Sequence, residues 1–274
     1  MVDKSMVDKN KEERLSLGLE ELVVVLNLLG YAEVAKGLLV TQLGEIGPNE
    51  ERGRLLAANH SLMAKEILYL QGGAIRMEEG PARLLGFLIA NDYAVRGTAR
   101  NIKAAEESLT CYIRGGEVVE HRLTHGVVHA FRRSDPAAAV DALAAFMLPA
   151  DREAFQAPPF TLGDDRLQEA QSLIAAEGAE AGAAFFRGLG ADEAAAAPLA
   201  EDLNRQTLRS AAMQVTIDMS TGINADRGYL ILAGATGRAW VMDIREQNGA
   251  GELTVQPATE KLVGQLTKAL FNGH

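Results

Sequence analysis

Cysteine, tryptophan and long apolar runs are scarce in this chain of 274 residues. The single cysteine, Cys111, excludes an intramolecular disulfide and any metal site built from several thiolates. No segment reaches the roughly 18 consecutive apolar residues of a membrane span, and the start of the chain lacks the apolar core of a signal peptide. We therefore expect a cytoplasmic protein that does not insert into a membrane, with residues 1–14 as a disordered tail.

An excess of positive charge is missing as well. The chain has 27 Lys and Arg against 37 Asp and Glu, a formal net charge of −10, and no run of basic residues. Such a charge favours solubility and opposes binding to the phosphate backbone of nucleic acids, which we do not expect as partners. The apolar share of 47% is enough for a large core, so the length predicts one large domain or two closely packed halves.

The chain does contain an internal repeat. Its front copy, Ser16-Leu17-Gly18-Leu19-Glu20-Glu21-Leu22, returns as Thr161-Leu162-Gly163-Asp164-Asp165-Arg166-Leu167. The back ends also correspond, because a glycine turn, a strand-like segment, a proline and an apolar helix follow one another near Gly115 and Pro136 and again near Gly237 and Pro257. The two offsets differ by about one helix of six turns, and we assign this extra segment of the first half to a helix over residues 48–71.

Apolar periodicity predicts the elements of both halves. Helices are expected at residues 16–29, 48–71 and 81–89, from residue 161, at 192–208 and near both back ends; strands are expected at 109–113, 118–123, 127–133, 213–219, 229–233, 239–244 and 252–256, with a loop at 220–227. Each half thus changes from a helical period to an alternating one. The final helices carry Val140, Leu143, Phe146 and Met147 in the first half and Leu262, Val263, Leu266, Leu270 and Phe271 in the second.

These elements predict an α+β fold. Two copies of a unit made of helices, an antiparallel meander and a helix cannot each cover both faces of so few strands, so we expect them to share a central, mainly antiparallel sheet flanked by helices, around a pseudo-twofold axis. The expected halves are residues 15–148 and 160–274, joined by a proline-containing linker at 149–159. Both halves are expected to form one compact domain.

Three histidines form the most suggestive group for chemistry. His121, His125 and His129 would share one face of a helix, but the surrounding valines and the glycine indicate strands, where residues four apart lie about 13 Å from one another. That distance is too long for one metal ion. We interpret them as structural or surface residues and expect no metal and no cofactor.

The remaining candidates also have ordinary structural interpretations. Asp218 and Asp226 flank a polar segment without the spacing of an EF-hand, and Ser61 with Lys65 is one residue too long for a Ser-x-x-Lys nucleophile, which leaves helix surface. Core packing is expected for Cys111 and Trp240, and the acidic pairs at helix starts complement the helix dipole. Since no nucleophile, base and orienting group converge, we predict no catalytic residues and no enzyme activity.

The order of these features resembles the EspG family of type VII secretion chaperones over nearly the whole chain. The resemblance is carried by Leu28-Leu29-Gly30, Leu84-Leu85-x-x-Leu88 before a strand at Val95, Leu148-Pro149, Arg227-Gly228-Tyr229-Leu230 and Leu253-Thr254-Val255-Gln256-Pro257-Ala258. It implies a pseudo-twofold α+β fold with a central antiparallel sheet. It also implies a cytosolic chaperone that binds a helical secreted or exported protein and keeps it soluble.

In the EspG family, the contacts with the partner come from the sheet, a hairpin loop and C-terminal helices. The matching regions here are residues 213–229 and 259–271, and the partner-binding candidates they contain are Thr221, Ile223, Asn224, Asp226, Leu266, Leu270 and Phe271. Two alternatives stay open. One is a ligand-binding protein or enzyme with a pocket between the halves, and the other is a structural protein that self-associates, for example as a homodimer.

Overall fold

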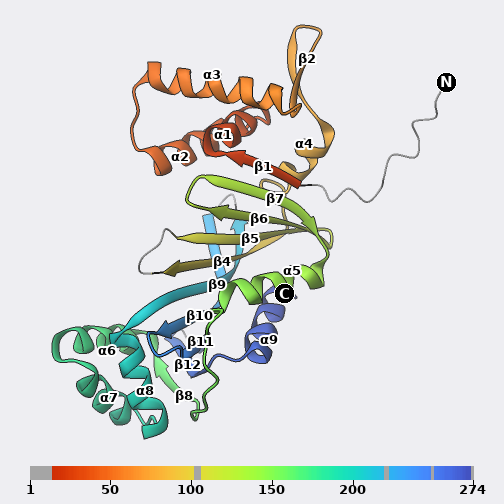
Figure 1. The fold of residues 1–274 in the computed structure, drawn as a ribbon. Helices are drawn as coiled ribbons and strands as arrows, with labels where there is room; N and C mark the ends of the chain where they lie inside the picture. The colour runs from red at the N-terminus through yellow and green to blue at the C-terminus, as the bar shows by residue number, and fades with distance from the viewer. Residues whose placement is uncertain (1–13, 102–105, 219–221, 248–249, 273–274) are drawn as a thin grey trace. The chain divides into compact units, whose positions relative to one another are not determined.

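The computed structural model describes residues 14–101, 106–218, 222–247 and 250–272 (Figure 1). They form an α+β protein with a large antiparallel sheet, which confirms the predicted fold class. The contacts divide the chain into two units. The first unit comprises Met1–Asn91 and Tyr112–Asp135, and the second comprises Asp92–Cys111 and Pro136–His274. The predicted tail lies almost wholly outside the described residues.

The first unit combines helices with three strands of the large sheet and a separate hairpin. Its strand order is β1-β7-β6, and both pairings are antiparallel. The elements are β1 (Arg14–Gly18), α1 (Leu19–Leu28), α2 (Ala32–Leu43), α3 (Pro48–Ala64), β2 (Leu68–Gln71), β3 (Ala74–Met77), α4 (Glu79–Gly86), β6 (Glu117–Thr124) and β7 (Val128–Ser134).

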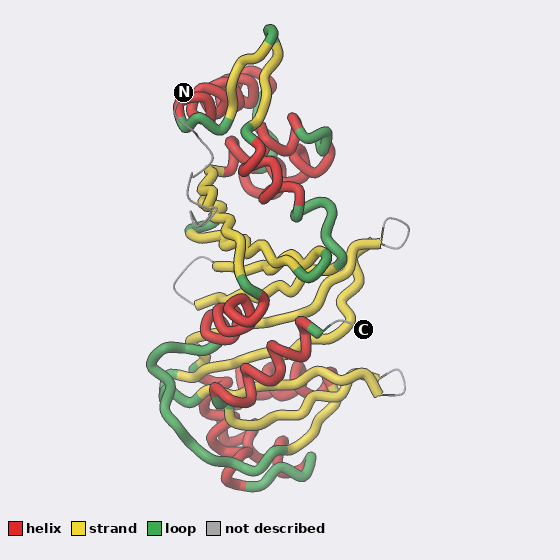
Figure 2. Tube along the Cα trace, turned by 90° about the vertical axis from the view of Figure 1, so that its right-hand side faces the viewer, coloured by secondary structure: helices red, strands yellow, loops and turns green. Residues whose placement is uncertain are grey.

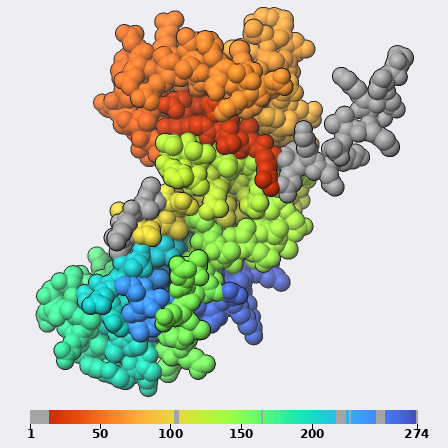
Figure 3. Space-filling model, in the orientation of Figure 1, coloured from red at the N-terminus to blue at the C-terminus, as the bar shows by residue number. Residues whose placement is uncertain are grey.

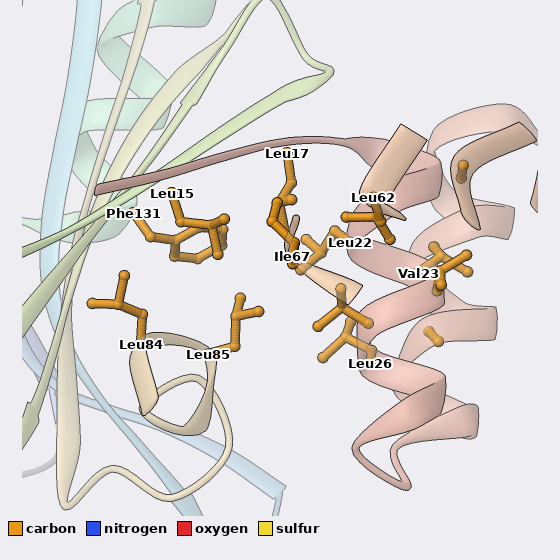
Figure 4. Packing of buried hydrophobic residues seen from close by; sticks show 14 of the residues in the cluster. Leu15, Leu17, Leu22, Val23, Leu26, Leu62, Ile67, Leu84, Leu85 and Phe131 are labelled. Atoms are coloured by element: carbon orange, nitrogen blue, oxygen red, sulfur yellow. The ribbon is translucent and has the colours of Figure 1, made fainter. Parts of the chain in front are cut away.

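The core of the first unit forms where strands β1 and β7 meet helices α1, α3 and α4. Leu15 and Leu17 alternate inward along β1, and Phe131 of β7 lies beside Leu15 (Figure 4). In helix α1 every residue from Leu22 to Leu26 is buried. Burial of these side chains supplies most of the stability of such a unit.

The second unit contains six antiparallel strands in the order β4-β9-β10-β11-β12-β8. Its elements are β4 (Tyr93–Asn101), α5 (Pro136–Met147), β8 (Phe160–Gly163), α6 (Asp164–Glu177), α7 (Ala179–Gly188), α8 (Glu193–Asn204), β9 (Gln206–Asp218), β10 (Gly222–Gly234), β11 (Ala239–Gln247), β12 (Ala250–Pro257) and α9 (Glu260–Phe271). The division between the units falls within β5 (Glu107–Arg114), after Cys111.

The two halves of the chain share one order of pairing. Each front copy forms a short strand followed by a helix, β1 with α1 and β8 with α6. Strand β1 pairs with β7, which precedes α5, and β8 pairs with β12, which precedes α9. Each helix begins after an extended glycine, Gly18 or Gly163.

The helix predicted for residues 48–71 is wrong at its C-terminal end. Helix α3 ends at Ala64, and Leu68–Gln71 forms strand β2. Gly72 and Gly73 have φ angles of 58° and 80°, which suit a tight hairpin turn, and β3 follows. A short apolar segment fits a helix and a strand equally well by periodicity, so the sequence alone favoured continuing the helix.

Further boundaries also differ from prediction. The helices expected from residues 16 and 161 begin at Leu19 and Asp164, because the residues before them form strands β1 and β8. The helix expected at 192–208 ends at Asn204, and Leu208 lies in β9. The loop expected at 220–227 is shorter, because β10 begins at Gly222 and pairs with β9 from there, while residues 219–221 lie outside the described residues. Apart from Ile223, residues 222–227 are polar or small, so their alternation is too weak to reveal a strand.

Candidate protein-binding site

Helices α5 and α9 cover one face of the strands at one end of the second unit. They pack against each other, and they contact β4, β9 and β10 (Figure 2). Gly97 of β4 faces α5 so closely that a Cβ atom there would lie 2.6 Å from Leu143 Cδ1. Gly97 therefore allows the close approach of helix and strand.

The C-terminal half of α9 is fastened to the strands by three hydrogen bonds. The Tyr229 hydroxyl lies 2.6 Å from Thr267 Oγ1, and both residues are buried. Burial raises the pKa of Tyr229 to about 12, although the bond to Thr267 opposes the shift. Arg227 donates to the Ala269 carbonyl at 3.2 Å and Tyr93 donates to the Phe271 carbonyl. These donors satisfy carbonyls that the end of a helix leaves without an intrahelical partner.

One hydrogen bond joins the strand that carries some of the predicted binding residues to the last turn of α9. Arg227 follows Asp226 in β10, and its bond to Ala269 joins this part of the strand to the last turn of α9. Asn224 is exposed and pairs with Thr216 of β9. Thr221 lies outside the described residues, and for Ile223 and Asp226 only the backbone in β10 is described.

The three predicted residues of α9 differ in exposure. Leu270 is buried, with 3% of its surface exposed, and contributes to packing under the helix. Leu266 and Phe271 are half-buried. The exposed positions of α9 are polar and partly cationic: Glu260, Lys261, Gln265 and Lys268, followed by the exposed Asn272 after its end. A partner on this helix would thus meet a polar stripe bordered by two half-buried apolar side chains.

Large exposed apolar side chains gather elsewhere, in the first unit. The β2–β3 hairpin projects beyond helices α1–α3 in two views, and its surface adjoins that of α3 (Figures 1, 2 and 3). Leu70 and Ile75 face each other across this hairpin, with 66% and 38% of their surfaces exposed. Leu28, Tyr31, Val34, Val40 and Leu56 are also exposed in α1–α3 and their connections.

Two of the three histidines meet across β6 and β7. His121 Nε2 lies 2.9 Å from His129 Nδ1, and the His121 ring stacks on Phe131 with centroids 4.4 Å apart. His129 is buried, and burial lowers its pKa to about 4. His125 is exposed at the turn with a φ of 54°. The distance between residues along one strand does not predict this contact, because the contact depends on the register between the two strands.

Asp202 forms a polar centre in the interior of the second unit, with several hydrogen bonds. It is fully buried in α8 and accepts hydrogen bonds from Trp240 Nε1 at 2.8 Å, Arg238 Nε at 2.9 Å and the Thr236 hydroxyl. Trp240 is itself fully buried, which confirms core packing for the only tryptophan. The donors saturate the carboxylate, so this centre fastens α8 to the β10–β11 turn and has no free group for chemistry.

Ser61 and Lys65 have a structural role that the sequence did not reveal. Both bind the carboxylate of Glu21, each at 2.7 Å, and Glu21 also accepts from the Gly18 N–H at 2.8 Å. Burial raises the pKa of Glu21, but the bonds from Lys65, Ser61 and Gly18 outweigh it, and the pKa is lowered. Glu21 thereby caps α1 and joins it to α3.

Other classes of site are not formed by the described residues. Cys111 is fully buried, which confirms its packing role. Among these residues, no three His, Cys, Asp or Glu side chains come close enough to hold a metal ion. None of the helices in the described ranges has the length and apolar character to cross a bilayer.

A comparison with solved structures defines the class of fold. The type VII secretion system chaperone EspG5 of Mycobacterium tuberculosis, in its complex with the PE25-PPE41 dimer, superposes with a TM-score of 0.69. The match covers 94% of this chain and 96% of that chain at 16% identity. The chain therefore has an EspG-like fold, as the sequence resemblance implied.

A family model matches residues 14–267, which is most of the chain. The family is described as "Uncharacterised protein YfjC", and the chain belongs to this YfjC family. No curated protein sequence matches the chain.

Proposed function

We propose that this protein is a non-catalytic cytoplasmic chaperone that binds a helical protein partner and keeps it soluble for export. The observation that carries the proposal is the likeness to EspG5 over nearly the full length of both chains. EspG5 is seen bound to the PE25-PPE41 dimer. The saturated hydrogen bonding of Asp202 supports a non-catalytic role for that buried polar centre.

The proposed partner contacts belong to the segment 221–226 of the chain, which runs into β10, and to the last turns of α9. They comprise Thr221, Ile223, Asn224 and Asp226 of the first group and Leu266 and Phe271 of the second, with Leu270 as packing beneath them. The bond between Arg227 and Ala269 supports one continuous site, because it ties these two segments together. A rigid site loses less entropy on binding than two mobile segments would.

Site-specific photocrosslinking tests the proposal in the native cytoplasm. A photoreactive amino acid at Asn224 or Gln265 is expected to capture one and the same helical protein, and a probe at the exposed Glu169 of α6 serves as the control. The captured protein, made recombinantly, should form a complex with a Kd below about 1 μM. When the captured protein is diluted into buffer, its aggregation, measured by light scattering, should be weaker in the presence of the chain than without it.

Two results would speak against the chaperone role. One is the absence of a shared crosslinked protein at both positions. The other is a captured protein that stays soluble without the chain, since a chaperone would then have nothing to protect.

A further inference from the structure

The face of β4 and β9 that points away from α5 carries three arginines. Gly97 faces α5, so its neighbours Arg96 and Thr98 point to the opposite face, and Arg100 follows on the same side. Helices α6 and α8, which lie on this opposite face, contact β8, β10 and β12. Arg96 and Arg100 are exposed.

The register between β4 and β9 places the third arginine beside them. Arg100 pairs directly with Arg209, Thr98 pairs with Ala211, and Arg96 pairs with Met213. Arg209 is exposed, whereas Thr98, Ala211 and Met213 are half-buried. We call Arg96, Arg100 and Arg209 the arginine patch. It has a floor of small and apolar side chains between its cations.

The charges of the arginine patch are not neutralised by an ion pair among the described residues. Like charges directly opposite on neighbouring strands repel each other, so the pairing of Arg100 with Arg209 costs stability. The cost is unexpected in a chain with a net charge of −10, where carboxylates outnumber cations.

We propose that the arginine patch binds an acidic face of the protein partner, an inference that rests on the proposed chaperone function. Guanidinium groups bind carboxylates with two parallel hydrogen bonds, which fixes orientation as well as affinity. The same face of β9 continues through Met213 to Val215, and Val215 pairs with the exposed Ala225 beside Asn224. Asn224 itself pairs with Thr216 and lies on the other face, the face of α5 and α9, so the patch is a contact surface separate from the proposed site at α9.

The spacing of the patch specifies the partner further. Four residues along a strand separate Arg96 from Arg100 by about 13 Å. A helix covers this distance in about nine residues. The partner is therefore a helix with Glu or Asp residues on one face, two to three turns apart.

Charge balance distinguishes a protein from a nucleic acid here. Three cations would contact only a few phosphates, and the negative charge of the remaining chain would repel the rest of the duplex. An acidic helix can place its carboxylates on the patch and turn its other faces away.

Fluorescence anisotropy with a labelled 20-residue helical peptide tests the proposal directly. The peptide carries glutamates on one face, and its counterpart carries lysines at the same positions. We expect the glutamate peptide to bind the wild-type chain at low salt at least tenfold more tightly than the lysine peptide does. The triple variant R96E/R100E/R209E should lose at least tenfold in affinity.

A second triple variant controls for net charge. Lys36, Arg52 and Arg76 are exposed cations of the first unit, and K36E/R52E/R76E changes the total charge by the same amount. This variant should bind the glutamate peptide within twofold of wild type. Equal losses in both triple variants, no binding to wild type, or equal binding of a DNA duplex would overturn the proposal.

The single variant Arg209→Glu separates binding from folding. It replaces a repulsive pair with an attractive one, so its Tm should rise while its affinity for the glutamate peptide falls. A fall in both would indicate a structural role for Arg209 and would contradict the proposal.

The crosslinked partner of the proposed site distinguishes the two levels of the hypothesis. If the partner binds the wild type and R96E/R100E/R209E equally well, the chaperone function stands and the patch proposal fails. If the glutamate peptide binds through the patch but no partner is captured at Asn224 or Gln265, the chaperone function fails and the patch remains an acidic-helix site.

Discussion

The buried imidazole of His129 makes the stability of the first unit depend on pH. Its pKa of about 4 lies below the ordinary value of 6.5, since burial disfavours the charged ring. As the pH falls below about 6.5, the unfolded chain takes up a proton at this position and the folded chain does not. The folded state should therefore lose up to ~3 kcal/mol from this group between about pH 6.5 and 4.

Urea unfolding at pH 7.5 and 5.0 measures this effect. His129→Leu should show a smaller loss of stability on acidification than wild type, while the exposed His60→Gln serves as the control and should follow wild type. Equal pH dependence in wild type and His129→Leu would contradict the assignment.

Asp202 is expected to be the most sensitive polar residue of the second unit. Asp202→Ala leaves the buried indole N–H of Trp240 without an acceptor and removes a partner of Arg238, which should cost ~3 kcal/mol or more of unfolding free energy. Glu201→Ala removes only a partly exposed ion pair with Arg238 and should cost less than ~1 kcal/mol. Chemical denaturation measures the unfolding free energy of both variants. Equal losses of unfolding free energy would contradict the central role of Asp202.

Single residues were predictable where burial alone decides their role. Cys111 and Trp240 lie in the core as expected, because apolar neighbours on both sides predict it. The His121–His129 contact, the three bonds to Glu21 and the pairing of Arg100 with Arg209 were not predictable, because each joins residues distant in sequence. The arginine patch has no run of cations in the sequence to indicate it, because the register of β4 and β9 brings its arginines together.

At the scale of elements, Gly97 controls how closely α5 approaches β4. Gly97→Val would push side-chain atoms into Leu143, Phe146 and Met147 and should destabilise the fold by ~1–3 kcal/mol.

Gly37 of α2 offers the contrasting case, since a Cβ there meets nothing within 4 Å. Gly37→Ala should stabilise the protein by ~0.5–1 kcal/mol through helix propensity. Thermal unfolding measures whether each substitution raises or lowers the stability. An unchanged stability of Gly97→Val would contradict the close packing of α5 on β4.

Elements with a clear period were predictable, and their ends were not. The strands at 109–113, 118–123 and 127–133 and both back-end helices were found, because alternation and helical spacing are strong there. The β2–β3 hairpin was missed, since its apolar residues continue the spacing of α3 and its glycines also suit a helix stop. The first part of β10 was missed because all of its side chains except that of Ile223 are polar or small.

At the scale of the whole molecule, order along the chain was more informative than any motif. The repeated sequence of a front segment, a meander and a helix predicted an α+β fold with a large antiparallel sheet, and it did so without a catalytic or metal signature. The binding surface was less accessible to prediction, because surfaces have no period. Of the α9 residues proposed from the resemblance, Leu270 proved to be packed inside.

The position of Cys111 gives the protein a built-in kinetic reporter. Its thiol is fully buried in β5, next to the point where the two units divide, and it is the only cysteine of the chain. A thiol reagent can therefore react only while β5 is open, and labelling should be at least about 100-fold slower than in the unfolded chain. The labelling rate measured by mass spectrometry, with and without a bound partner, would report in real time how a ligand on one surface restrains the interior strand.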